Sequence, residues 1–284
     1  MKIGVSSYCF SRCVEAGMSM EDVVRNAKEM GFDQIEITEF PPVDGESLPE
    51  TAARIRACCE KEGLPIHAYV VFADFINGSG GDPAAEAERV KGMVDVAVVF
   101  GAKLMRHDTT WGFRDRPGTF KEAADIIAPH IRGVAEYAQS KGVRTMSENH
   151  GYFVQESARM EYLIEKVNHS NYGALIDVGN FLCADEDPIL AVSRLAPYGF
   201  HAHAKDFLWK DGRLPAPGAD WFPTRGGHHI RGTIVGHGVV PVAQCVKILR
   251  DGHYAGDLGL EFEGPEEVLH AVKAGLDYLR KIVG

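Results

Sequence analysis

The chain of 284 residues carries 40 acidic and 30 basic side chains, which gives a formal net charge of −10 at pH 7. A net negative charge gives no sign of a basic surface that would neutralise many phosphates, and no apolar run approaches the roughly 18 residues of a membrane span. We therefore expect neither a nucleic-acid nor a membrane partner. The first residues lack the pattern of a signal peptide, and the six scattered cysteines do not form a disulfide framework. These features favour a cytoplasmic protein with reduced thiols.

Short apolar segments alternate with segments of helical period along the whole chain. The predicted strands are residues 2–8, 34–37, 65–71, 103–108, 144–149, 172–178, 200–205 and 257–263, with helices between them. The pairs Asp82-Pro83, Asp187-Pro188 and Gly264-Pro265 place proline where a first helical turn tolerates it. Eight strand–helix repeats most simply close into a (β/α)8 TIM barrel, which we predict as a single domain over residues 1–284.

An open, doubly wound parallel sheet is the alternative fold. The first strand is followed by "SSYCFSRC" instead of a glycine-rich turn, so dinucleotide binding has no support.

Residues 208–240 depart from this regular pattern. The segment is long, is rich in glycine and proline, and follows the seventh predicted strand. Loops of this length in compact domains are usually functional or disordered. We therefore predict a lid-like insertion over the face where barrel enzymes carry out chemistry.

Four metal-binding residue types fall at the carboxyl ends of four successive predicted strands: Glu148, Asp177, His203 and Glu261. Neighbouring strands lie about 4.8 Å apart, so these side chains can meet around one point. Three carboxylates and one imidazole favour an open divalent site, with Mn²⁺ preferred and Mg²⁺, Co²⁺ or Zn²⁺ as alternatives. The competing interpretation is a set of unrelated polar residues at loop starts.

Further polar residues are candidates for binding a substrate because they lie on the later strands, near strand ends or in the insertion. They are His67, His107, His150, Asn180, Lys205, His237 and Glu263. Lys205 can equally form a structural ion pair. His201 has the strand parity of His203, and we interpret it as a buried, hydrogen-bonded histidine rather than a second ligand.

Four motifs carry a family resemblance: "SENHG" (147–151), "LIDVGNF" (175–181), "HAHAKD" (201–206) and "GLEFEGPE" (259–266). In this order and spacing they resemble the xylose isomerase-like TIM-barrel superfamily, which includes sugar isomerases and epimerases, inosose dehydratase and endonuclease IV. The resemblance covers essentially the whole chain and implies the same four metal ligands. Asn180 stands where the endonuclease IV pattern has a histidine, which disfavours a nuclease.

Together these features predict a divalent-metal-dependent isomerase or epimerase of a sugar, ketose or sugar derivative. It would act by proton transfer through a metal-bound enediolate, with Glu148 and Glu261 as the catalytic residues. The first alternative is a lyase or dehydratase of a keto-sugar or inosose that uses the same metal site. A non-catalytic sugar-binding barrel and an AP-endonuclease-like nuclease are less favoured. The expected partner is a small carbohydrate, and a homo-oligomer is left open.

Overall fold

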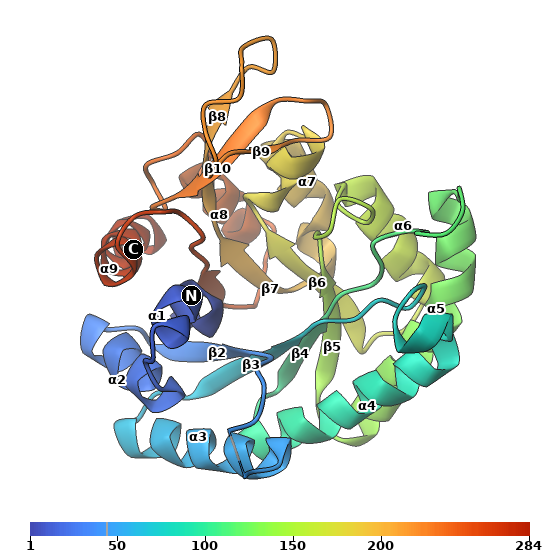
Figure 1. Ribbon diagram of the computed structural model, residues 1–284, viewed down its shortest axis with the longest axis horizontal. Coiled ribbons are helices and arrows are strands. Elements are labelled where there is room, and N and C mark those ends of the chain that lie inside the picture. The colour runs from blue at the N-terminus through green and yellow to red at the C-terminus, as the bar shows by residue number, and fades with distance from the viewer. Residues whose placement is uncertain (44) are drawn as a thin grey trace.

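Eight parallel strands close into a barrel in the order β1-β11-β7-β6-β5-β4-β3-β2 (Figure 1). The computed structural model describes residues 1–43 and 45–284. The barrel strands are β1 (Ile3–Ser6), β2 (Gln34–Thr38), β3 (Ile66–Val71), β4 (Leu104–His107), β5 (Arg144–Glu148), β6 (Tyr172–Asp177), β7 (Gly199–Ala204) and β11 (Leu258–Leu260). The first and last strands pair directly, with Ile3 opposite Leu258 and Val5 opposite Leu260. The predicted TIM barrel is therefore confirmed, and an open sheet is excluded.

Helices surround the barrel and begin and end largely where the sequence indicates. They are α1 (Ser11–Glu15), α2 (Met20–Met30), α3 (Leu48–Glu62), α4 (Pro83–Phe100), α5 (Phe120–Ser140), α6 (Ser157–Val167), α7 (Pro188–Leu195), α8 (Val242–Asp251) and α9 (Val268–Val283). Asp82 accepts hydrogen bonds from the backbone N–H groups of Ala84 and Ala85, and Pro83 is the first helical residue of α4. The prediction from Gly264-Pro265 is wrong in detail, because α9 begins only at Val268 and is capped by Glu267.

The barrel interior has an apolar lower layer and a charged upper layer. Ala68, Leu104, Met146 and Leu175 form a buried apolar cluster inside the barrel. In a strand, residues two positions apart share a face. The residues two positions after Leu104, Met146 and Leu175 are therefore Arg106, Glu148 and Asp177, which lie above the cluster toward the carboxyl ends of their strands.

The segment that follows β7 is more regular than predicted. A three-stranded antiparallel sheet in the order β8-β10-β9 occupies this region: β8 (Asp206–Lys210) begins just before the predicted insertion, and β9 (Phe222–Pro223) and β10 (His229–Thr233) lie within it. This sheet stands beyond the barrel at the top of Figure 1. The glycine- and proline-rich stretch between β8 and β9 concealed the alternation of these short strands. No helix in residues 1–43 or 45–284 combines the length and the apolar character needed to cross a membrane.

Candidate functional site

The four predicted metal ligands meet at the carboxyl end of the barrel. Glu148 and Asp177 are the last residues of β5 and β6, His203 is the penultimate residue of β7, and Glu261 directly follows β11. One ligand atom from each of the four lies within 4.8 Å of the others. Nδ1 of His203 is 3.4 Å from Oε2 of Glu261, 3.9 Å from Oδ2 of Asp177 and 4.0 Å from Oε1 of Glu148.

Several atoms of this cluster are buried without a hydrogen bond. Oδ2 of Asp177, Nδ1 of His203 and Oε2 of Glu261 have no hydrogen-bond partner among the described residues. Nζ of Lys205 lies 2.7 Å from Oε2 of Glu261, but the two groups are not aligned as a hydrogen bond. Buried polar atoms without partners are costly. Together with Oε1 of Glu148, which accepts a hydrogen bond from Asn180, they give three oxygens and one nitrogen, a donor set that fits a divalent cation.

The electrostatics of the cluster also favour a cation. Burial, reinforced by the charges of Glu148 and Glu261, raises the pKa of Asp177 above its usual range. Burial opposes ionisation of Glu261 as well, but Lys205 and His203 hold its pKa well below the ordinary value. Carboxylates this close do not all ionise without compensating positive charge. A divalent ion would supply that charge.

Glu148 is held on both of its oxygens. Nη2 of Arg106 lies 2.7 Å from Oε2 of Glu148 and 2.7 Å from Oδ1 of Asp108. Nδ2 of Asn180 donates to Oε1 of Glu148 at 2.9 Å. Burial alone would lower the pKa of His150, but its hydrogen bond to Asp108 raises that pKa above its ordinary value. These contacts fix the orientation of the Glu148 carboxylate, and the side chains that make them form a polar surface beside it.

Lys205 lies among acidic groups, as the ion-pair interpretation expects. Its Nζ is 3.4 Å from Oδ2 of Asp177 and 3.6 Å from Oε2 of Glu263, in addition to the Glu261 contact. It also donates to Oδ1 of Asn180 at 3.2 Å. The ammonium group borders the cavity, so it remains within reach of a bound oxygen.

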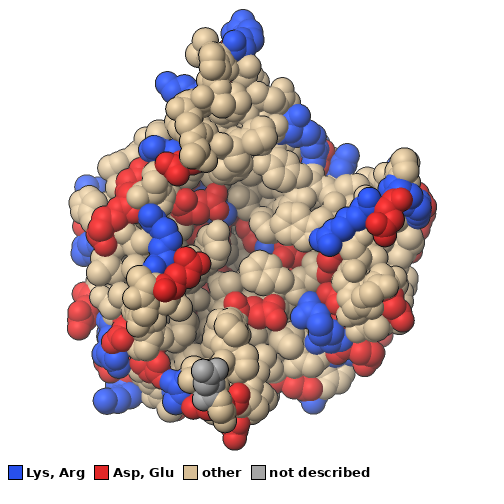
Figure 2. Space-filling view, viewed as in Figure 1, with Lys and Arg blue, Asp and Glu red and all other residues tan. Residues whose placement is uncertain are grey.

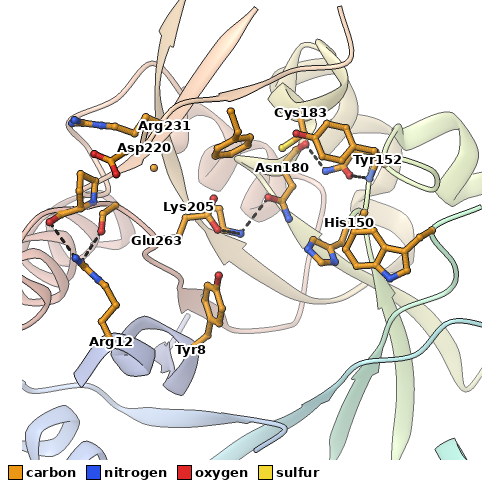
Figure 3. Close-up of a pocket in the computed structure, with 17 residues that line it drawn as sticks. Tyr8, Arg12, His150, Tyr152, Asn180, Cys183, Lys205, Asp220, Arg231 and Glu263 are labelled. Atoms are coloured by element: carbon orange, nitrogen blue, oxygen red, sulfur yellow. Dashed lines mark hydrogen bonds and ion pairs between the residues drawn. The ribbon is translucent and has the colours of Figure 1, made fainter. Parts of the chain in front are cut away.

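A cavity opens above the cluster. Its outer part has a volume of about 480 Å³, and a smaller part of about 90 Å³ lies against Arg106, Glu148 and Glu261. Both parts are lined by Tyr8, His150, Lys205 and Glu263, which surround a common space in Figure 3. Arg231 and Asp220 from the insertion line the outer part (Figure 3). Figure 2 shows the molecule hollowed over the barrel, with acidic side chains around the hollow.

Three predicted substrate-binding residues lie elsewhere. His67 is the second residue of β3, far from its carboxyl end, and its ring lies 4.6 Å from the ring of His201. His107 has the opposite strand parity to Arg106 and packs against Phe75 and Tyr172 on the outside of the barrel. The structure therefore brings neither histidine to the cavity.

His237 is the third of these residues. It lies in the turn between β10 and α8, where its backbone N–H donates to the carbonyl of Ile234, and it is exposed outside the cavity lining. His237 does not lie over the barrel, because it follows the end of β10 at Thr233 and is no longer part of the three-stranded sheet.

Sequence reasoning missed several charged residues at the site, and Arg106 and Glu36 are the most deeply buried of those inside the barrel. Arg106 and Glu36 are both 3% exposed, and both point into the barrel from mid-strand positions. A charged residue within an apolar strand, at a position whose side chain faces the barrel interior, is the sequence pattern that could have identified both.

Comparisons with known proteins agree with this geometry. A family profile described as xylose isomerase-like TIM barrel matches residues 24–282. Among curated proteins, the chain is 22% identical over 208 residues to an inosose dehydratase of Bacillus thuringiensis (strain Al Hakam). That match covers 70% of this chain and 63% of the relative, so the chain spans less than two thirds of this relative's length.

Solved structures share the whole fold at low identity. A D-psicose 3-epimerase from Clostridium cellulolyticum H10, solved with D-tagatose, has a TM-score of 0.76 at 15% identity, covering 100% of this chain and 99% of the other. A 3-keto-D-glucoside 4-epimerase from E. coli has a TM-score of 0.73 at 17% identity, covering 99% of both chains. A probable 3-DHS dehydratase from Bacillus anthracis has a TM-score of 0.73 at 19% identity, covering 99% of both chains. The named relatives are enzymes, and with a profile match over most of its length the chain belongs to the xylose isomerase-like TIM-barrel family.

Proposed function

We propose that the protein is a divalent-metal-dependent isomerase or epimerase of a sugar or sugar derivative. The observation that carries the proposal is the convergence of Glu148, Asp177, His203 and Glu261 beside a cavity of about 480 Å³. Mn²⁺ is the preferred ion. When bound by these four residues, it would act as a Lewis acid on substrate oxygens and make a neighbouring C–H bond more acidic.

The protein's own side chains then divide the remaining work. Glu148 and Glu261 both border the inner part of the cavity, where one would take a proton from a substrate carbon and the other would return one. Arg106 and Asn180 keep Glu148 in one orientation. Lys205 would donate a hydrogen bond to a substrate oxygen. Return of the proton to the same carbon gives epimerisation, and return to the next carbon gives isomerisation.

Elimination of water is the second candidate reaction. The curated relative named above is an inosose dehydratase, and one structural neighbour is a probable dehydratase. Elimination also needs an acid near the leaving oxygen. His150 and Glu263 line both parts of the cavity and supply two such groups.

A single experiment separates these reactions. The Mn²⁺-loaded protein is incubated in D₂O with ketoses, ketose phosphates, inososes and 3-keto glycosides, and each product is analysed by NMR and mass spectrometry. Deuterium at a substrate carbon without loss of water supports an isomerase or epimerase, and loss of water identifies a dehydratase. Glu261→Gln should stop either reaction while the barrel stays folded. If no substrate exchanges or eliminates, the protein is a sugar-binding barrel and the proposal is refuted.

A further inference from the structure

A buried glutamate contacts the imidazole of His203 from the side opposite the cluster. Oε2 of Glu36 lies 3.1 Å from Nε2 of His203 and 3.5 Å from Nε2 of His201. Glu36 is 3% exposed, and both histidines are 1% exposed. β2 and β7 are not neighbours, because β1 and β11 lie between them, so the contact crosses the barrel interior.

The barrel leaves room for this contact at Gly259. This residue of β11 pairs with His203, and a Cβ atom added there would lie 2.9 Å from Cδ2 of His203 and 3.0 Å from Nε2 of His201. Any other residue would displace at least one imidazole. His201 is also anchored from below, since its Nδ1–H donates to the carbonyl oxygen of Asp257 at 3.1 Å.

The two nitrogens of His203 therefore face different environments. Nδ1 faces Glu148, Asp177 and Glu261, whereas Nε2 faces Glu36, the one acidic group beside it in the described part of the chain. A neutral imidazole has one N–H and one lone pair, and a carboxylate accepts only from the N–H. A hydrogen bond from Nε2 to Glu36 thus leaves the lone pair on Nδ1.

We propose that Glu36 is a positioning residue that holds His203 with its N–H on Nε2 and its Nδ1 lone pair directed at a divalent cation. The inference rests on one part of the proposed function, the binding of a divalent cation by the four ligands. Carboxylate partners of this kind orient histidine ligands and raise their basicity. Glu36 would not touch the substrate, because it lines neither part of the cavity.

A second cation held by Glu36, His201 and His203 is the competing arrangement, because their ligand atoms also lie within 4.8 Å of one another. An ion on Nε2 of His203 would take the imidazole's one lone pair and turn an N–H toward three carboxylates. The lone pair of Nδ1 would then no longer be available beside the carboxylates of Glu148, Asp177 and Glu261. One ion per chain, on the Nδ1 side, is therefore expected.

Binding of Mn²⁺ to metal-free protein, measured by calorimetry, tests the inference without any substrate. Wild type should bind one ion per chain, and Glu36→Gln should bind it about 10- to 100-fold more weakly. Glu86→Gln is the matched control, because Glu86 is 2% exposed in α4 and accepts from the backbone of Asp74. It should lower the melting temperature but leave the Mn²⁺ affinity unchanged.

Unchanged affinity in folded Glu36→Gln would overturn the inference, as would two ions per wild-type chain or none. Nitrogen-15 NMR of Zn²⁺-loaded wild type provides a readout that needs no variant: the N–H of His203 should lie on Nε2, and an N–H on Nδ1 would overturn the inference. Normal ion affinity without any turnover would count against the proposed function alone.

Discussion

Replacing Arg106 with methionine should destabilise the barrel strongly, because the guanidinium compensates two buried carboxylates. Arg106 is 3% exposed, and its Nη2 lies 2.7 Å from both Glu148 and Asp108. Burial alone would lower the pKa of Arg106, but the charges of Asp108 and Glu148 raise it above its ordinary value. Methionine fills most of the same space without the charge, so the loss reports on electrostatics more than on packing.

The expected loss is about 3–5 kcal/mol of unfolding free energy, the usual cost of removing one partner from a buried ion pair. Domains are stable by only about 5–15 kcal/mol, so this loss is a large fraction of the total stability. Asp108→Asn removes one of the two uncompensated carboxylates. The double variant Arg106→Met/Asp108→Asn should therefore lose less stability than the sum of the two single variants.

Urea unfolding at pH 7 with excess chelator gives the comparison, because a bound cation near Glu148 would partly replace the lost charge. Arg25→Met is the control for removing an exposed pair: Arg25 lies 2.5 Å from Asp22, but their side chains are 45% and 44% exposed. Exposed pairs contribute little, so no measurable change is expected. A loss below about 1 kcal/mol for Arg106→Met, or strict additivity in the double variant, would refute the reasoning.

Three further outcomes are expected. Mn²⁺ at about one hundred times its dissociation constant should raise the unfolding free energy of wild type by about 2.7 kcal/mol. Asp177→Asn should show no such gain in denaturant titrations with and without the ion. Burial lowers the pKa of His107 from 6.5 to about 4, so the unfolded chain binds the extra proton more readily and stability is lost as the pH falls from 6.5 toward 4. Between pH 7 and 5, wild type should therefore lose about 2 kcal/mol more than His107→Phe in urea titrations, and equal pH slopes would contradict the assignment. Gly259→Ala should weaken Mn²⁺ binding by about tenfold through displacement of His203, whereas an unchanged calorimetric affinity would show that the imidazole tolerates the methyl group.

The fold could be predicted because its signals are local and repeated. Asp82 followed by Pro83 marks the start of α4, and the stripe of Met160, Leu163, Ile164 and Val167 is buried along one face of α6. The sheet β8-β10-β9 was missed because its strands are short and its connections are rich in glycine and proline. Antiparallel pairing there is defined by distant partners, such as Ile230 opposite Trp209, which no local pattern reveals.

The four converging ligands followed from one rule, that the carboxyl ends of barrel strands share a face. The same rule did not apply to His67, which lies at the other end of its strand, or to His107, which has the outward parity. Both histidines were predicted from their residue type, without regard to their position along the strand or the face on which they lie. Strand parity would have selected Arg106 in place of His107, and it points to Glu36 within "QIEI".

The contact of Glu36 with His203 could not be read from the sequence, whereas the charge balance around it argues for a cation. The contact joins residues 167 positions apart across two intervening strands, so it depends on barrel closure and register. Around the site, the buried carboxylates are Glu36, Asp108, Glu148, Asp177 and Glu261, whereas the buried permanent cations are Arg106 and Lys205. Acids therefore outnumber these cations, and a divalent ion would remove most of the excess negative charge.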